Sequence, residues 1–391
     1  MKVEKLRQDF EVLKKGIIYF DNACMTLRPR QVVAAINSYY NEFPACGERS
    51  QHQLGKRVTE EMEKARRVMA KFIGAKEREI IFTKNTTEGI NLVSHGLDLD
   101  KNDVVLTTDK EHNSNLLPWQ GFDHSVVRSN EDNTFNLERF EEMVRKKKPK
   151  LVAMGWTSNL DGISIPVREV VKIAHENGAL VLLDGAQAVP HKEINVKKLD
   201  VDFLAFSGHK MCGPTGTGVL YGKLDLLEKL RPFIIGGGTV KESWYGKCEF
   251  EEVPERFEAG LQNYSGIIGL AEAAKYLNKI GLGNISKHEM SLNKRITEGL
   301  GDDVKLIGPQ DASLREGIFS FNIPGVDMHE VAGVLDSSAK IAVRAGGHCV
   351  HSWFNEHNLK GSVRASVYFY NTLEEAEKFV EEVKKIVKFL K

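Results

Sequence analysis

The chain has 391 residues, 41% of them hydrophobic, and its 54 basic and 54 acidic side chains give a formal net charge of zero at pH 7. This composition predicts a globular protein and argues against a nucleic-acid binder or a disordered chain, since both usually carry an excess of one charge. No apolar run approaches the ~18 residues of a membrane span, and the amino-terminal stretch is charged where a signal peptide is apolar, so we expect a cytoplasmic protein without membrane contact. The five cysteines are widely scattered, so we expect no disulfide framework.

Helical and strand patterns alternate from about residue 58 to residue 222, which is typical of βαβ units that build a mostly parallel sheet. In chain order, the elements predicted here are a helix over 59–72, a strand over 80–83, a helix from about 87, a strand over 104–108, a helix over 138–148, a strand over 151–156, a helix over 167–177, and strands over 180–183 and 203–206. The run at 180–183 is apolar throughout, as in a central parallel strand that is buried on both faces.

The pattern changes from about residue 265. It continues with two helices, strands over 317–322, 341–344 and 363–366, and a terminal helix over 372–391, where Thr372 and Glu375 have the spacing of a capping box. The sequence therefore predicts an α/β protein. Its predicted parts are a large domain over residues 18–264, a smaller C-terminal α+β domain over residues 265–391, and an N-terminal segment, residues 1–17, that packs on the small domain.

The most informative segment runs from Ser207 to Lys210 (SerGlyHisLys), directly after a predicted buried strand and directly before a glycine-rich loop. A lysine at the end of a central strand is partly desolvated, which lowers the pKa of its amine and makes it available for a Schiff base. The alternative is a surface lysine in a loop, because short clusters of Ser, His and Lys are common.

Other polar residues follow neighbouring strands, and ligands of open α/β sheets bind outside the carboxyl ends of the strands. Asp184 and Gln187 follow the strand at 180–183, where a carboxylate can keep a pyridinium nitrogen protonated, as pyridoxal phosphate chemistry requires. Thr86 and Thr87 stand where a turn enters a helix, and this position suits a phosphate as well as an ordinary N-cap. His112 follows the strand at 104–108 and could lie over a planar cofactor or be a core or surface histidine.

The second domain contributes a flexible loop, ArgAlaGlyGlyHisCys, that ends at Cys349. A cysteine beside His348 and near Arg344 has an electropositive setting that favours the nucleophilic thiolate, although a buried structural cysteine is the alternative. Arg364 ends another strand, and its planar guanidinium suits either a substrate carboxylate or a structural ion pair. The histidines and cysteines lack the paired spacing of a metal site, so we expect no metal.

Taken together, these segments resemble the class V aminotransferase family from about Ile18 to the C-terminus, and within it the cysteine desulfurases of the SUF-type or selenocysteine-lyase-like group. The motifs that carry the resemblance are ThrThrGluGlyIleAsn (86–91), GluHis (111–112), SerAsn (158–159), AspGlyAlaGln (184–187), SerGlyHisLys (207–210), GlyProThrGly (213–216), ArgPheGluAlaGly (256–260) and ArgAlaGlyGlyHisCys (344–349). The loop before Cys349 is compact, and it lacks the longer serine-rich loop of the other desulfurase group.

The resemblance implies the type I fold of PLP-dependent transferases, in which the large domain has a mostly parallel seven-stranded sheet, with pyridoxal 5′-phosphate as the cofactor. It implies that Lys210 binds the cofactor covalently, that Asp184 pairs with the pyridine nitrogen and that Gln187 faces the ring hydroxyl. The other implied cofactor-binding residues are His112, stacked on the ring, Thr86, Thr87, Ser207 and His209, at the phosphate, and Asn159. The implied substrate-binding residues are Arg364, Asn159, Arg344 and His348.

The implied reaction converts L-cysteine to L-alanine and leaves a persulfide on Cys349, with Lys210 as the base and His112 as a candidate proton donor. The family is homodimeric, with candidate contributions from the partner in Arg49, His52 and residues 256–260, and the sulfur would pass to an acceptor protein for iron–sulfur cluster or other thio-cofactor biosynthesis. The alternatives are selenocysteine lyase, another class V reaction such as cysteine sulfinate desulfination, transamination or epimerisation, and a non-catalytic sulfur-relay scaffold.

The sequence departs from the family's pattern in three respects. Leu261 stands where the family commonly has a threonine that reaches a phosphate across the dimer, and Asn113 stands where relatives often have a basic residue. Cys24, Cys46 and Cys212 are additional thiols, so the residues alone leave open which cysteine carries the sulfur.

Overall fold

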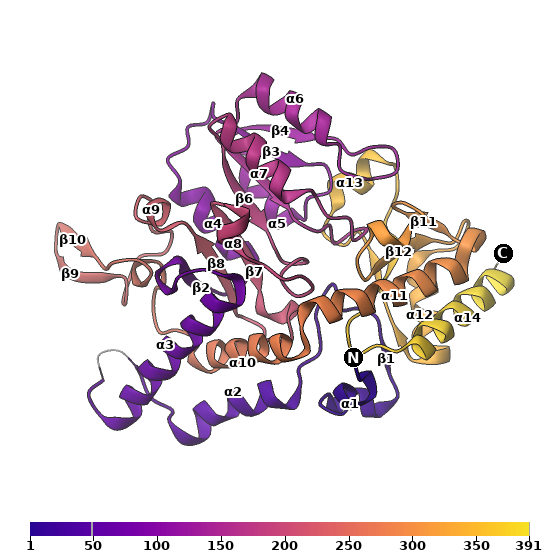
Figure 1. The fold of residues 1–391 in the computed structure, drawn as a ribbon, viewed down its shortest axis with the longest axis horizontal. Coiled ribbons are helices and arrows are strands. Elements are labelled where there is room, and N and C mark those ends of the chain that lie inside the picture. Colours follow the sequence, from indigo (N-terminus) through magenta and orange to yellow (C-terminus); the bar gives the residue numbers. More distant parts are fainter. Residues whose placement is uncertain (48–49, 391) are drawn as a thin grey trace.

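The computed structural model describes residues 1–47 and 50–390, and Arg49, which the resemblance suggests for a subunit interface, lies outside them. A seven-stranded sheet forms the centre of the larger part of the molecule, with strand order β2-β8-β7-β6-β5-β3-β4 (Figure 1). Its strands are β2 (Ile80–Thr83), β3 (Val104–Thr108), β4 (Asp123–Val127), β5 (Leu151–Gly155), β6 (Leu180–Asp184), β7 (Phe203–Ser207) and β8 (Gly218–Gly222). Strand β8 runs antiparallel to both of its neighbours, and the other paired strands are parallel. The predicted α/β class and seven-stranded, mostly parallel sheet are confirmed.

Helices cover both faces of this sheet because the strands are apolar on both sides. On one face, α3 (Gln53–Ile73), α6 (Leu137–Lys147), α7 (Val167–Glu176) and α10 (Tyr264–Ile280) share a core with side chains such as Leu183 and Leu204. On the other face, α4 (Thr86–Gly96) packs with Leu182 and Phe203. Neighbouring residues of one strand thus point into different cores, which follows from the alternation of side chains along a strand.

The C-terminal part has its own antiparallel sheet, in the order β11-β12-β15-β14 (Figure 1). Its strands are β11 (Lys305–Ile307), β12 (Ile318–Asn322), β14 (Arg344–Gly346) and β15 (Ser362–Ser366), and its helices are α11 (Leu282–Leu300), α12 (Met328–Ala339) and α14 (Leu373–Leu390). The predicted strand at 341–344 is divided, because β13 (Ile341–Ala342) leaves this sheet to pair with β1 (Ile18–Tyr19). The capping box of α14 is confirmed, since the Glu375 amide donates to Thr372 Oγ1 and the Thr372 amide donates to a Glu375 carboxylate oxygen, both at 3.2 Å.

The N-terminal residues lie against the C-terminal part near the start of α14 (Figure 1). Arg7 forms an ion pair with Glu375 at 2.7 Å, and the ring of Phe10 packs on Phe369 and Tyr370. The boundaries proposed at residues 17 and 264 stay predictions. None of the described helices combines the length and apolar character needed to cross a membrane.

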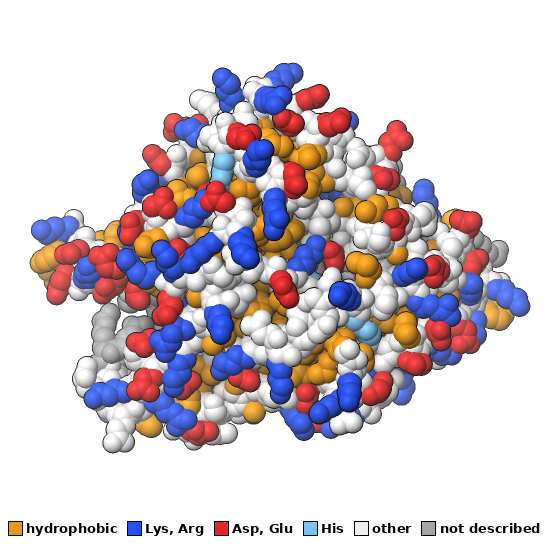
Figure 2. Space-filling model, in the orientation of Figure 1, with side chains coloured by type: hydrophobic (Ala, Val, Ile, Leu, Met, Phe, Trp, Pro, Cys, Tyr) orange, Lys and Arg blue, Asp and Glu red, His pale blue; other side chains and the backbone are white. Residues whose placement is uncertain are grey.

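A hairpin of β9 (Val240–Trp244) and β10 (Lys247–Phe250) projects from the larger part (Figure 1). Its outer residues are exposed, including Trp244 and Tyr245. Over the face drawn in Figure 2, basic and acidic side chains are interspersed rather than gathered by sign. The sequence analysis did not predict this hairpin because its residues follow no buried pattern.

Candidate active site

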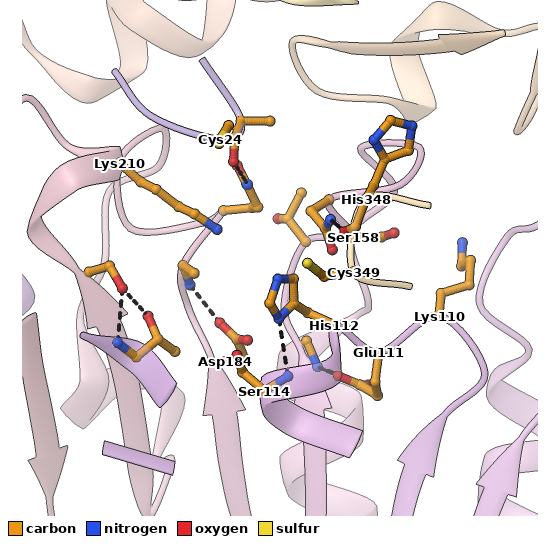
Figure 3. A pocket seen from close by; sticks show the side chains of 18 of the residues that line it. Cys24, Lys110, Glu111, His112, Ser114, Ser158, Asp184, Lys210, His348 and Cys349 are labelled. Carbon is orange, nitrogen blue, oxygen red and sulfur yellow. Dashed lines mark hydrogen bonds between the residues drawn. The ribbon is translucent and has the colours of Figure 1, made fainter. Parts of the chain in front are cut away.

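A cavity of about 430 Å³ opens at the carboxyl ends of β3, β5, β6 and β7, and the Cys349 loop closes it from the side of the small sheet (Figure 3). It brings together every residue that the sequence analysis assigned to cofactor, substrate or catalysis: Thr86, Thr87, His112, Asn159, Asp184, Gln187, Ser207, His209, Lys210, Arg344, His348, Cys349 and Arg364. The cavity therefore lies at the edge of the sheet where ligands of open α/β sheets bind.

Lys210 and Asp184 form the charged centre of the cavity. Lys210 ends a short 3₁₀ turn after β7, and its amine and the Asp184 carboxylate point into the same space (Figure 3). Burial lowers the pKa of Lys210, while the charge of Asp184 opposes that shift. Burial likewise raises the pKa of Asp184, while Lys210 and the hydrogen bond from the Ala186 amide, at 2.9 Å, favour its ionised form. A partly desolvated amine is a better nucleophile, as a Schiff-base lysine requires.

A cradle of hydroxyl groups lies at the start of α4. The Thr86 amide donates to Ser207 Oγ at 2.8 Å, and the two hydroxyl oxygens are 2.6 Å apart. Asn85 caps the helix by accepting from the Glu88 amide at 2.9 Å. Because Asn85, Thr86 and Thr87 line the cavity, the positive end of the α4 dipole lies at the cavity wall. Burial and the nearby Lys210 lower the pKa of His209 to about 4, so this imidazole is neutral and offers one N–H. The cradle suits a phosphate.

His112 lies beside Cys349 in the cavity (Figure 3). Burial, Lys210 and Arg364 lower the pKa of its imidazole to about 3. Its Nδ1 accepts a hydrogen bond from the Ser114 amide at 3.1 Å and caps α5 (Asn113–Leu116), so the single ring proton is on Nε2. His112 is thus a neutral ring with one defined N–H.

Cys349 is exposed at the tip of a loop with unusual backbone geometry. The φ angles of His348 and Cys349 are +47° and +58°, in the left-handed region that residues other than glycine rarely adopt. Three contacts hold this conformation: the Asn113 amide donates to the Cys349 carbonyl at 2.7 Å, Asn159 Nδ2 donates to the His348 carbonyl at 2.8 Å, and His348 Nε2 lies 2.9 Å from Ser362 Oγ. The contact from Asn113 uses its backbone amide, so it does not depend on the departure from the family's pattern at this position.

One expectation about this loop is wrong. His348 does not add positive charge beside Cys349, because burial, reinforced by Arg364 and Arg344, lowers the pKa of its imidazole to about 2. The positive charge near Cys349 comes from the two arginines, which line the same cavity. The sequence could not predict a neutral His348, because its burial depends on contacts with Ser362 and Phe354.

Arg364 is buried in β15 and offers an unsatisfied donor. One of its terminal nitrogens donates to the Asn159 carbonyl at 2.9 Å, but its Nε has no hydrogen-bond partner. A buried donor without a partner is costly. Arg364 also lines the cavity, where its planar guanidinium suits a carboxylate. Asn159 has used one amide hydrogen on the His348 carbonyl and retains the other.

The structure distinguishes between the cysteines, of which the sequence left open which one carries the sulfur. Cys24 and Cys349 line the cavity, whereas Cys46 and Cys248 are exposed outside it. Cys212 is fully buried, and burial raises its pKa far above the usual range of a thiol. A buried neutral thiol is a poor nucleophile, so Cys212 is a structural residue.

Sequence reasoning gave no role to Glu111, although it stands in a quoted motif. This buried carboxylate accepts from the Gly155 amide at 2.9 Å, from Asn115 Nδ2 at 2.7 Å and from Thr108 Oγ1 at 2.6 Å. It ties the ends of β3 and β5 to α5, which carries His112 as its cap. Burial raises its pKa to about 7 against the pull of these hydrogen bonds.

The residues expected at the subunit interface have local roles here. His52 caps α3 by accepting from the Gly55 amide at 3.1 Å, and Arg256 donates to the Leu227 carbonyl at 3.1 Å. Leu261 is 72% exposed. The neighbouring Gln262 donates to the Ala259 and Gly260 carbonyls, at 3.2 and 3.3 Å.

These observations fit pyridoxal 5′-phosphate. The cavity offers a partly desolvated amine, an opposing buried carboxylate for the ring nitrogen, a hydroxyl cradle at a helix N-terminus for the phosphate and a neutral imidazole beside the ring site. These groups come from several loops at the sheet edge, and all of them line one cavity (Figure 3).

Comparison with known proteins agrees with this reading. The family model described as Aminotransferase class-V matches residues 18–379. A probable cysteine desulfurase of Pyrococcus abyssi is 42% identical over 99% of this chain and 98% of its own length. The apo structure of a cysteine desulfurase from Thermococcus onnurineus NA1 has a TM-score of 0.94 at 42% identity, covering 98% of each chain, and the Escherichia coli cysteine desulfurase CsdA, solved in its S-sulfonic acid form, has a TM-score of 0.92 at 30% identity over both whole chains. The chain therefore belongs to the class V aminotransferase family and, within it, groups with the cysteine desulfurases.

Proposed function

We propose that the protein uses pyridoxal 5′-phosphate to convert L-cysteine to L-alanine, and that Cys349 takes up the sulfur as a persulfide. One observation carries the proposal: an exposed thiol, held on a strained loop, lines the same cavity as Lys210 and Asp184. A transaminase needs the lysine and the aspartate but has no use for a thiol at this position.

We assign the cofactor to the residues of the cavity. Lys210 would bind it covalently, Asp184 would face the ring nitrogen and Gln187 the ring hydroxyl. The residues assigned to its phosphate are Thr86, Thr87, Ser207 and His209, and those beside the ring are His112 and Asn159. When bound, the cofactor supplies an electron sink for the negative charge that develops at the substrate α-carbon.

The other groups act on the substrate. The guanidinium of Arg364 binds the α-carboxylate, with the free amide hydrogen of Asn159 alongside, and Arg344 and His348 border the same space. Lys210 moves the α-proton of the substrate. Nε2 of His112 carries a proton that it can donate to a substrate atom in the cavity. The Cys349 thiolate attacks the substrate sulfur: the Cβ–S bond breaks, an S–S bond forms, and Cβ gains a proton, so alanine and a persulfide result without an external oxidant.

We further propose a cytoplasmic homodimer that passes the sulfur to an acceptor protein, for iron–sulfur cluster or other thio-cofactor biosynthesis. The support for a dimer is a set of exposed apolar side chains on and near the β9–β10 hairpin, namely Ile235, Trp244, Tyr245 and Leu261. Sedimentation velocity tests it, since a monomer at micromolar concentration would contradict the dimer.

The central test is anaerobic incubation of the holoenzyme with L-cysteine and a reductant. We expect alanine and sulfide in equal amounts, and in a parallel sample without the reductant mass spectrometry should find one extra sulfur on Cys349. Cys349→Ser should keep the absorbance of the bound cofactor but form no persulfide, whereas Cys46→Ser, which removes an exposed thiol outside the cavity, should behave as wild type. An extra sulfur on Cys24 with Cys349 unmodified would contradict the assignment. Comparing kcat/KM for L-cysteine and L-selenocysteine tests the alternative of a selenocysteine lyase.

A further inference from the structure

Four hydrogen-bond donors converge on the buried carboxylate of Glu111, which has no part in the function proposed above. Its Oε1 accepts from the Thr108 hydroxyl at 2.6 Å and from the Thr108 amide at 3.2 Å, and its Oε2 accepts from Asn115 Nδ2 at 2.7 Å. The Gly155 amide donates to both oxygens, at 3.0 and 2.9 Å. The Thr108 hydroxyl accepts from the Lys110 amide at 3.3 Å, so its own hydrogen is left for Glu111. These partners fit an acceptor with two equivalent oxygens, which is an ionised carboxylate.

Asn115 connects this carboxylate to His112. Trp119 Nε1 donates to Asn115 Oδ1 at 3.3 Å, which agrees with an amide orientation that directs Nδ2 at Glu111. The backbone amide of Asn115 donates to the His112 carbonyl at 2.8 Å, and the Ser114 amide donates to His112 Nδ1 at 3.1 Å. Asn115 thus contacts Glu111 through its side chain and His112 through its backbone.

Gly155 connects the same carboxylate to Asp184. Gly155 and Asp184 are paired residues on the neighbouring strands β5 and β6. A Cβ atom at position 155 would lie 3.3 Å from Glu111 Oε2, which is tighter than most contacts of real Cβ atoms, so the glycine permits the close approach. Glu111 therefore fixes the position of His112 relative to Asp184, the carboxylate assigned to the ring nitrogen.

We propose that Glu111 is a positioning residue, which holds His112 beside the cofactor ring while Asp184 faces the ring nitrogen. The inference rests on the proposed function, in which Nε2 of His112 donates a proton to a substrate atom. An amide cannot replace the carboxylate. In Glu111→Gln the new NH₂ group would face either Asn115 Nδ2 or the donors of β3, and turning the Asn115 amide over would leave the Trp119 N–H without an acceptor. At least one donor loses its partner in every orientation.

The test is Glu111→Gln in the holoenzyme. We expect kcat for alanine formation from L-cysteine to fall about tenfold with KM within about twofold of wild type, because Glu111 does not belong to the groups that bind the substrate carboxylate. Adding Asn115→Asp should restore kcat to within about threefold of wild type, since the new carboxylate can accept from both the glutamine amide and Trp119 Nε1. The matched control is Asp202→Asn. Asp202 is 3% exposed, like Glu111, and accepts from the Val181 amide at 2.7 Å at the amino ends of β6 and β7, so its loss should lower Tm but leave kcat unchanged.

A second measurement separates positioning from general structural support. In a His112→Gln background, Glu111→Gln should change kcat by less than about twofold, because its effect passes through His112. A purely structural role would give the same loss in both backgrounds, and this result would overturn the inference. Wild-type kcat in Glu111→Gln, no recovery on adding Asn115→Asp, or an equal loss in Asp202→Asn would also overturn it.

If Glu111→Gln yields no holoenzyme, Gly155→Ala supplies a smaller change, because the added methyl group displaces the carboxylate without removing it. It should lower kcat in wild type but not in the His112→Gln background, and an equal effect in both would overturn the inference.

The visible circular dichroism of the bound cofactor gives a readout without turnover, because it depends on the surroundings of the ring. The spectrum should change in Glu111→Gln and return on adding Asn115→Asp, and an unchanged spectrum in Glu111→Gln would contradict the positioning of His112. Failure of wild type to form alanine from L-cysteine would contradict the proposed function instead, and the comparison of spectra would still test the role of Glu111.

Discussion

Ser362→Ala is expected to slow persulfide formation on Cys349 without loosening the cofactor. The Ser362 hydroxyl is fully buried and lies 2.9 Å from His348 Nε2, and His348 Nδ1 has no other partner. The variant therefore leaves both ring nitrogens of a buried imidazole unsatisfied, which costs about 1–3 kcal/mol. The left-handed backbone of His348 and Cys349 already costs about 1–3 kcal/mol per residue. The loop therefore needs its hydrogen bonds to keep this conformation.

At about 1.4 kcal/mol per factor of ten, this loss corresponds to a reduction of up to two orders of magnitude in the population of the productive loop. Water can bind the imidazole once the loop moves outward, which recovers part of this free energy. We therefore expect the rate of persulfide formation to fall about tenfold. Rapid-quench single turnover with L-cysteine, followed by mass spectrometry of Cys349, measures it. Ser362→Thr keeps the hydroxyl and should restore the rate, and Ser291→Ala, an exposed serine bonded to the His288 carbonyl, serves as the control. A wild-type rate in Ser362→Ala, even with a lower Tm, would refute the reasoning.

Two further predictions concern the charged and neutral groups of the cavity. Lys210→Ala should abolish alanine formation and allow the cofactor to leave on dialysis, and unchanged alanine production would contradict the assignment of this lysine. The free energy of unfolding should fall as the pH drops from about 6.5 toward 4, because burial lowers the folded-state pKa values of His112, His209 and His348 to about 3, 4 and 2, while the unfolded chain binds these protons near pH 6.5. Glu111, whose pKa is raised to about 7, acts in the opposite direction, as one group against three. Urea titrations at pH 7 and pH 5 measure this slope; His348→Gln should make it shallower, and a stability independent of pH would contradict the prediction.

The sequence predicted those parts of the molecule that depend on local patterns. Continuous apolar runs predicted the buried strands of the sheet. The rule that ligands bind at the carboxyl ends of strands then predicted that Asp184 and Lys210 lie at the same edge. Strand β4 escaped prediction because it lies at the sheet edge, where Asp123, His124 and Ser125 are not fully buried and interrupt the apolar pattern.

The features that sequence reasoning missed depend on contacts between distant segments. Asp21 lies 3.7 Å from a terminal nitrogen of Arg344 and of Arg364, and no spacing in the sequence predicts that these three residues lie together. The left-handed conformation of Cys349 is equally hidden, because neither histidine nor cysteine favours positive φ and the bonds from Asn113 and Asn159 impose it.

The pairing of the chain's beginning with its end has a consequence for biosynthesis. Strand β1 lies beside β13, the Ser366 amide donates to the Phe20 carbonyl at 2.7 Å, and Asn22 Nδ2 donates to the Ser366 carbonyl at 2.7 Å. During translation, residues 18–24 are made early and have no partner until residues 341–366 have been synthesised, although the mostly parallel sheet over residues 80–222 can form before then. The sheet edge that carries Lys210 can therefore form well before Arg364 and the Cys349 loop have been synthesised. The Cys349 thiol reaches the cavity of Lys210 only after that.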